Sequence, residues 1–189
     1  KILKDMEKIS IISSTNLAKF FNSIETVASQ ATKKFIEVQS GIISLENFLS
    51  EYGHLRPGTY DPLQFRYDQK PEIYLNQKRN KSIFPEKTND SNFILDDYFD
   101  KKEIGQIKDF LKTFPTEITI ESFFNFVIAA IKGRELAKFK FTKVLSSFIE
   151  ILKKWGKSNK IDPSDLVYLE ISDILKFNTK KNEKEFSLL

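Results

Sequence analysis

Residues 51–68 (EYGHLRPGTYDPLQFRYD) hold the densest group of side chains that could do chemistry. Gly53, Pro57, Gly58 and Pro62 interrupt any regular element there, because proline fixes φ and lacks an amide donor. The surrounding side chains can bind an anion, an amide or a hydroxyl: His54, Arg56, Tyr60, Asp61, Arg66, Tyr67 and Asp68. Loops held by a rigid scaffold often carry binding residues, so we expect a binding site here. The alternative is a simple connector whose arginines and aspartates pair with each other.

The Pro57-Gly58 pair predicts a tight turn within this 51–68 loop. Proline is favoured at the second position of a type II turn, and glycine at the third, where φ is positive. Pro62 additionally favours an extended backbone at Asp61.

One long helix is expected from about Thr119 to Trp155, and Gly156 is expected to end it. One face of it follows helical spacing: Val127, Ile131, Arg134, Lys138, Phe141, Leu145, Phe148, Leu152 and Trp155. That spacing predicts a buried stripe. Arg134 and Lys138 interrupt it one turn apart, so we expect them to converge on one anion. Alternatively their long stems pack while the charged ends reach water. Gly133 beside them allows another backbone to approach closely.

The remaining elements also read as helices. Apolar residues at helical spacing predict a helix over 16–39, capped by Ser14 or Thr15 and ended by Gly41. Ser44 is expected to cap a short helix that ends at Gly53. Helical spacing resumes over 93–113, and residues 162–165 (DPSD) predict a further helix start. No stretch alternates like a strand, so the fold class expected is all-α: a single irregular helical domain over 1–189 with one Pro/Gly-rich functional loop.

Residues 69–92 are polar and contain little periodicity. A segment of this length without secondary structure is usually functional or disordered. We therefore expect residues 70–90 to be partly mobile, with a lid over the site as the alternative.

The composition argues against several classes of function and binding site for this chain, beginning with a zinc site. The chain has 189 residues, a formal charge of +4, one histidine and no cysteine. The usual zinc ligands are therefore scarce, and Asp96, Asp97 and Asp100 fit a helix N-terminus better than a metal site.

The basic cluster over 132–143 is interleaved with apolar residues, so no nucleic-acid partner is expected. No apolar run reaches the roughly 20 residues needed to span a bilayer and no signal peptide is recognisable, so a cytoplasmic protein is expected. Because the chain begins with Lys, we expect it to be part of a longer protein.

Several segments together resemble a known domain. YGHLRPGTYD followed by FRYD resembles a motif in the middle domain of phosphotransferases related to phosphoenolpyruvate synthase. FFNSIETVASQ resembles the preceding helix of that domain, and GRELAKFKFT and DPSDLVYLEISDIL its closing helices. The HLRPGTYD form looks closest to the glutamine kinases of capsule polysaccharide biosynthesis. Residues 69–92 match least.

The resemblance implies an acceptor-substrate-binding domain in a larger enzyme. Such enzymes bind ATP and Mg²⁺ in an ATP-grasp domain and carry a phosphohistidine on a swivelling domain. Neither of these two domains would belong to this fragment. The fragment itself would therefore hold no cofactor, no metal and no catalytic residue. The reaction implied is AMP-forming phosphorylation of a small-molecule acceptor, such as the side-chain amide of L-glutamine. The substrate-binding residues implied by position are His54, Arg56, Tyr60, Asp61, Arg66, Arg134, Glu135 and Lys138. Arginine and lysine would neutralise the transferred phosphoryl group, Asp61 would hold an ammonium group and Tyr60 would donate to a carboxylate.

The competing hypothesis is a non-enzymatic helical module that binds another protein through the loop. An exposed apolar groove without a polar pocket would favour that alternative. The sequence leaves open the acceptor's identity, the arrangement of the other domains and the oligomeric state.

Overall fold

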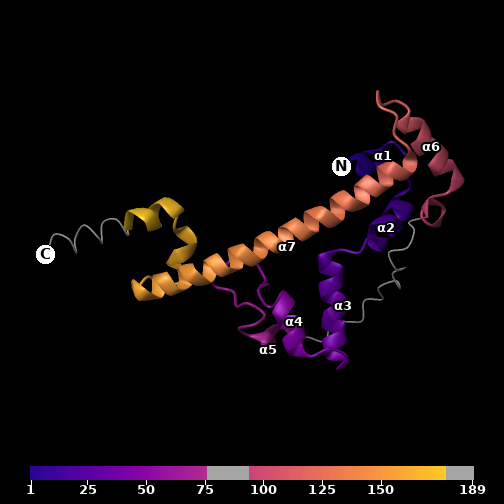
Figure 1. Ribbon diagram of the computed structural model, residues 1–189. Helices are drawn as coiled ribbons and strands as arrows, with labels where there is room; N and C mark the ends of the chain where they lie inside the picture. The colour runs from indigo at the N-terminus through magenta and orange to yellow at the C-terminus, as the bar shows by residue number, and fades with distance from the viewer. Residues whose placement is uncertain (76–93, 178–189) are drawn as a thin grey trace. The chain divides into compact units, whose positions relative to one another are not determined.

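The structure, a computed structural model, describes residues 1–75 and 94–177. Throughout these residues the regular elements are helices, which confirms the all-α class for the part described (Figure 1). The chain divides into two compact units, residues 1–42 with 78–139 and residues 43–77 with 140–189. Helix α7 (Ile120–Ser158) contributes residues to both. We describe each unit by itself, and the single domain expected over 1–189 stays a prediction.

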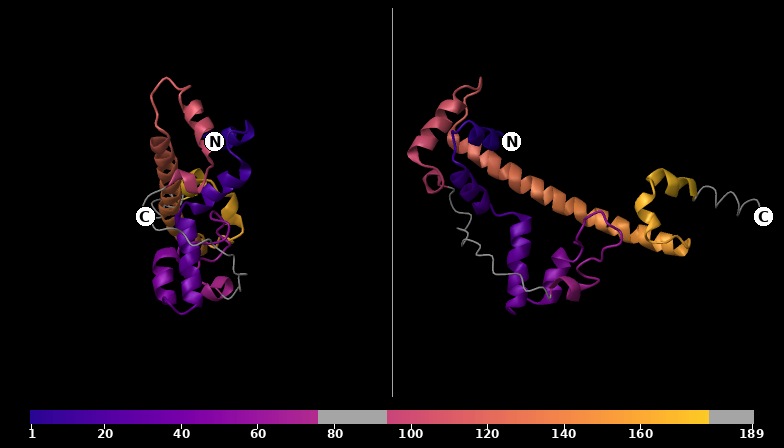
Figure 2. Two further views of the ribbon diagram at one scale, coloured as in Figure 1. Left: turned by 90° about the vertical axis from the view of Figure 1, so that its right-hand side faces the viewer. Right: turned by 180° about the vertical axis from the view of Figure 1, so that it is seen from behind.

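The first unit contains α1 (Ile2–Lys8), α2 (Ser14–Ser23), α3 (Val27–Gln39), the short 3-10 helix η1 (Leu95–Asp97), α6 (Lys101–Leu111) and the beginning of α7. Figure 2 shows α1, α2 and α6 gathered around that end of α7. Phe20 lies at the centre of the core, with its ring centroid 5.7 Å from that of Phe99 and 5.2 Å from that of Phe124. These contacts join three segments that are far apart in the sequence.

Glu103 ties two helix starts together in the first unit. Its carboxylate accepts hydrogen bonds from the backbone N–H of Ser13 and from Nδ2 of Asn16, each at 2.7 Å, and from the N–H of Asp100 at 3.1 Å. Ser13 caps α2, and Asp100 forms a capping box with Glu103 at α6. Asp100 therefore serves as a helix cap, as its position in the sequence suggested.

The single helix expected over 16–39 is wrong. Residue Ile24 is extended, and Thr26 starts α3 with a capping box to Ser29. The reason is that Thr26 and Ser29 exchange hydrogen bonds with each other's backbone, which ends the preceding helix and starts a new one. The caps expected for α2 at Ser14 or Thr15 are also one or two residues late, because Ser13 is the cap. Helix α1 lies in the upstream part that was expected to be helical, although no bounds had been predicted for it.

The second unit contains α4 (Leu45–Tyr52), α5 (Pro71–Leu75), the 3-10 helix η2 (Asp165–Tyr168), a helical segment over 171–177 and the remainder of α7. Ser44 caps α4 by accepting from the N–H of Asn47, and Gly53 ends it, both as expected. The helix start expected at residues 162–165 is present as the short 3-10 helix η2, which begins at Asp165, and helical structure resumes over 171–177. Of the 69–92 segment, Pro71–Leu75 is helical, and the mobility or lid expected farther along concerns residues outside the described part.

Three helices end in the same hydrogen-bonded motif, but with different residues in its left-handed position. After α1, α3 and α7 the left-handed residues are Ser10 (φ 60°), Gly41 (φ 71°) and Lys160 (φ 58°). Each is followed by a residue whose N–H bonds a carbonyl five positions earlier, as Ile161 does to Gly156 at 2.9 Å. This is the Schellman arrangement, in which glycine is the usual choice. Gly41 was correctly expected to end its helix.

Gly156 does not end the long helix, contrary to expectation. It lies within α7, where an added Cβ would meet Cδ2 of Leu166 at 2.9 Å. Leu166 is buried against it. The glycine therefore permits close packing, and the helix continues to Ser158 until Lys160 turns the chain.

The prediction of a buried apolar stripe along α7 is also wrong for the second half of that helix. Phe141 and Phe148 are 60% and 45% exposed, whereas Thr142, Ser146 and Ile149 are buried. The buried face of this half is thus partly polar, because it meets the polar 51–68 loop. The close backbone approach expected at Gly133 is absent, since a Cβ added there would have nothing within 4 Å among the described residues.

Candidate functional site

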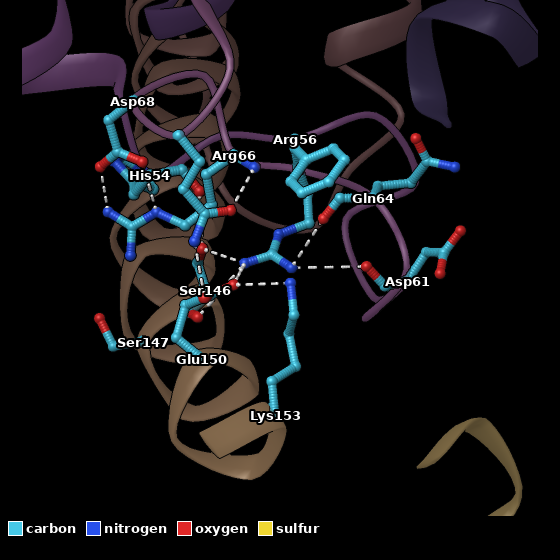
Figure 3. Close-up of polar contacts among 12 residues, drawn as sticks. His54, Arg56, Asp61, Gln64, Arg66, Asp68, Ser146, Ser147, Glu150 and Lys153 are labelled. Carbon is cyan, nitrogen blue, oxygen red and sulfur yellow. Dashed lines mark hydrogen bonds and ion pairs between the residues drawn. The ribbon is translucent and has the colours of Figure 1, made fainter. Parts of the chain in front are cut away.

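Arg56 fastens the 51–68 loop to α7. Its side chain is 1% exposed and lies 2.9 Å from Oε1 of Glu150. The same guanidinium donates to Oγ of Ser146 at 3.1 Å and to the carbonyl oxygens of Gln64 at 3.3 Å and Asp61 at 3.5 Å (Figure 3). Arginine suits this position because its planar fork can serve several acceptors at once. Its charge is met by Glu150, so the guanidinium positions the loop and is covered by the chain itself.

The two ends of the loop are joined by backbone hydrogen bonds. The N–H of Tyr67 donates to the carbonyl of Leu55 at 2.8 Å, and that of Asp68 donates to the carbonyl of Gly53 at 3.0 Å. A Cβ on Gly53 would lie 2.9 Å from Cβ of Asp68. Glycine at position 53 therefore allows the returning segment of the loop to pass directly over the end of α4.

The tip of the loop carries its most accessible groups. Gly58 has a φ of 56°, in the left-handed region that the Pro57-Gly58 turn predicted. Oδ1 of Asp61 accepts from the N–H of Leu63 at 2.8 Å, which holds the chain around buried Pro62. The Tyr60 side chain extends from this tip and is 71% exposed. Tyr60 is thus accessible to a ligand that approaches the tip.

Arg66 pairs with Asp68, and both flank the buried His54. The Arg66 guanidinium contacts both carboxylate oxygens of Asp68 in a bidentate arrangement. His54 accepts through its carbonyl oxygen from Oγ of Ser146 at 2.7 Å. Burial, together with the positive charges of Lys143 and Arg66, lowers the pKa of His54 below its ordinary value of 6.5. The imidazole is therefore neutral at physiological pH.

Glu150 and Ser146 are the important residues that the sequence analysis missed. Burial alone would raise the pKa of Glu150, but hydrogen bonds from Gln69 and Arg56 and the charge of Lys153 lower it. The carboxylate is thus ionised and receives Arg56 on one oxygen and Nε2 of Gln69, at 2.7 Å, on the other. The available signal was the polar series Thr142, Ser146 and Glu150, spaced one helical turn apart on one face of the helix.

The other three expected site residues belong to the first unit. Arg134 and Lys138 are exposed and Glu135 is partly buried on α7. Of the eight expected residues, the structure gathers His54, Arg56, Tyr60, Asp61 and Arg66 in one loop of the second unit. That Arg134 and Lys138 face this loop stays a prediction.

The side chains of the loop that solvent can reach are of types that bind ligands. The groups that the loop presents at least partly to solvent are the phenol of Tyr60, the carboxylate of Asp61 and the Arg66–Asp68 pair, and these can orient a polar ligand.

Within residues 1–75 and 94–177, no three metal-ligating side chains come together. No helix of the described residues has the length and apolar character needed to cross a membrane. Comparisons with family models, with curated proteins and with solved structures found no match for this chain.

Proposed function

We propose that this chain is the acceptor-substrate-binding domain of a phosphotransferase related to phosphoenolpyruvate synthase. The observation that carries the proposal is the buried Arg56, which holds a polar loop in one shape and leaves Tyr60 exposed and Asp61 partly exposed at its tip. A fixed loop with accessible polar groups is what a substrate site needs, since orientation contributes much of the rate enhancement in phosphoryl transfer. The resemblance of the loop sequence adds the reaction class.

In this proposal the residues divide into two roles. Arg56 and the neutral His54 shape the loop, while Tyr60, Asp61 and Arg66 bind the acceptor. Arg134, Glu135 and Lys138 are the further acceptor-site residues that the resemblance implies, and the two basic side chains would neutralise negative charge on the transferred phosphoryl group. The acceptor we propose is the side-chain amide of L-glutamine.

The phosphoryl group would come from elsewhere in the parent chain. An ATP-grasp domain would transfer it from ATP to a histidine of a swivelling domain, and one water would be consumed in splitting the second phosphoanhydride bond, so that AMP and phosphate are released overall. These cytoplasmic steps need ATP and Mg²⁺ in the parent protein. The contribution of this chain is to bind and orient the acceptor.

The test uses the full-length parent protein and ATP. Arg134→Met keeps much of the side chain's stem while removing its charge. We expect acceptor phosphorylation to fall at least about tenfold, equivalent to about 1.4 kcal/mol of transition-state stabilisation. Phosphorylation of the swivelling-domain histidine and the midpoint of thermal unfolding should stay unchanged.

Three results would oppose the assignment. Equal loss of both half-reactions, or unfolding of the variant, would make Arg134 structural. AMP release by this chain alone, above a heat-inactivated control, would show that it contains catalytic machinery of its own. The absence of a phosphohistidine domain from the parent gene would remove the proposed mechanism.

One observation favours the alternative of a protein-binding module. Residues on the outer side of α7 in the second unit are apolar yet 45–69% exposed: Phe141, Val144, Phe148 and Ile151. Exposed apolar patches often mark interfaces. If Phe148→Glu abolished capture of a partner protein while acceptor phosphorylation was absent from the parent, the module would be the better description.

A further inference from the structure

A second site lies in the second unit, away from the tip of the 51–68 loop. It is a pocket of about 770 Å³ between Phe65 and the last turns of α7, bordered also by residues 161–166. Phe65, Ile161, Pro163 and Leu166 provide apolar surface within it. Five lysines contribute to its walls: Lys70, Lys153, Lys154, Lys157 and Lys160.

The positive charge of this pocket is only partly compensated. Lys153 faces Glu150 at 3.6 Å and Lys70 faces Glu72 at 3.8 Å. Among the described residues, no carboxylate forms an ion pair with the other three lysines of the pocket. Glu150 is already occupied by Arg56. The pocket therefore presents an excess of ammonium groups to whatever enters it.

The second carboxylate of the pocket is directed toward its own loop. Oδ1 of Asp162 accepts from the N–H of Ser164 at 2.8 Å and from the Ser164 hydroxyl. These hydrogen bonds lower the pKa of Asp162. Asp162 thus shapes the wall of the pocket by holding the turn before η2.

The backbone at Lys160 lies in the left-handed region, as does the backbone at Ser10 after α1. Lys160 occupies the left-handed position after α7 with a φ of 58°, where the same motif after α3 has Gly41. A residue with a Cβ is disfavoured in this conformation, and glycine would relieve that strain. The strained residue supplies one of the pocket's lysines, so a change to glycine removes the charge and the strain together.

We propose that this pocket binds a small organic phosphate, and the inference does not depend on the function proposed above. Its volume falls within the range of roughly 300–1,000 Å³ that is typical of small-molecule sites. Lysine ammonium groups bind phosphate as point charges. The apolar surface of Phe65, Ile161 and Pro163 accepts the organic part of the ligand. A nucleic acid would instead favour an extended basic stripe.

The binding test uses phenyl phosphate as the probe, titrated calorimetrically into the chain. Inorganic phosphate supplies the charge without the organic part, and phenol supplies the organic part without the charge. We expect phenyl phosphate to bind at least about fivefold more tightly than either compound, because it uses both features of the pocket. Its affinity should fall as salt is added, since salt screens the charges of lysines that face solvent.

Lys160→Gly separates binding from folding. It should weaken phenyl phosphate binding at least about fivefold while raising the temperature of unfolding, because one charge and one strained residue are removed together. Ser10→Gly is the matched control: it relieves the same backbone strain in the first unit and should leave binding unchanged. Lys157→Gln should weaken binding similarly without added stability, whereas Lys101→Gln, a change on α6, should not affect it.

Three outcomes would overturn the proposal. The first is an affinity for phenyl phosphate that stays within about twofold of the original in both Lys160→Gly and Lys157→Gln. The second is binding of inorganic phosphate as tight as that of phenyl phosphate, which would indicate a general effect of charge. The third is displacement of phenyl phosphate by a single-stranded oligonucleotide at lower concentration than by pyrophosphate, which would identify a polyanion surface.

Discussion

The guanidinium of Arg56 donates to Oε1 of Glu150 over 2.9 Å, although 94 positions separate the two residues in the chain. Arg56 is almost fully buried, and the Glu150 side chain is 19% exposed. The pair joins the 51–68 loop to the second half of α7. A buried pair of this kind is destabilising to break from one side, because the remaining charge loses its partner.

Replacing Arg56 should therefore destabilise the second unit. We expect Arg56→Met to lower the free energy of unfolding by about 3 kcal/mol, since Glu150 would lose its buried partner. Arg66→Met is the matched control, because Arg66 pairs with the more exposed Asp68 and should contribute less than about 1 kcal/mol. Urea denaturation followed by circular dichroism measures both variants. Equal losses in the two variants would contradict the role assigned to Arg56.

His54 should make stability depend on pH just below neutrality. Because the pKa of His54 is lowered in the folded chain, the unfolded chain binds a proton more readily. Stability is then fully present above pH 6.5 and declines as pH falls from 6.5 through the folded pKa. The chain has one histidine, so a single imidazole signal in NMR should titrate below 6.5.

The control for this pH dependence is His54→Gln. This variant keeps a polar side chain of similar size but does not titrate. Its urea midpoint should be flat between about pH 7 and the folded pKa of His54. A wild-type imidazole that titrates above 6.5 would mean that burial and the positive charges of Lys143 and Arg66 do not dominate its environment.

Glu103 should account for part of the acid sensitivity of the first unit. Burial opposes its ionisation, but hydrogen bonds from Ser13, Asn16 and Asp100 lower its pKa below 4.5. Its contribution to stability is thus present above pH 4.5 and lost as pH falls through the folded pKa. Glu103→Ala should cost about 2 kcal/mol at neutral pH, since buried donors lose their acceptor. Exposed Glu117→Ala should change stability by less than about 0.5 kcal/mol, and a similar loss in both variants would argue against this network.

Two glycines should respond to alanine in opposite directions. Gly53→Ala places a methyl group against the carbonyl oxygen of Leu49 and 2.9 Å from Cβ of Asp68, and should destabilise the chain by about 1–3 kcal/mol, because the end of α4 and the loop must both move. Gly133→Ala adds a methyl group to open space within α7 and should stabilise the chain by roughly 0.5–1 kcal/mol. Thermal unfolding compares the two variants directly. Stabilisation by both would show that residue 68 adapts without cost.

Local sequence determined the features that depend on neighbouring residues. Ser44 and Gly53 bound α4, Gly41 follows α3, and Gly58 is left-handed, all as their positions predicted. Helix caps and tight turns are formed by hydrogen bonds and backbone preferences within a few residues, so they can be read from a short stretch. The helical character of the described chain and the polar loop followed from the same kind of signal.

Tertiary contacts decided the roles of the side chains. From the sequence, Arg56 is expected to bind an anion within its own loop. In the structure its hydrogen bonds to Glu150 and Ser146 instead hold that loop against α7. Gly156 reads as a helix stop, but Leu166 packs against it and α7 continues. These outcomes depend on groups brought together across long stretches of chain, and periodicity along one helix carries no information about its partner. For the same reason, the sequence could indicate the polar loop residues as site candidates, whereas the polar buried face of α7 that holds Arg56 appeared only in the folded chain.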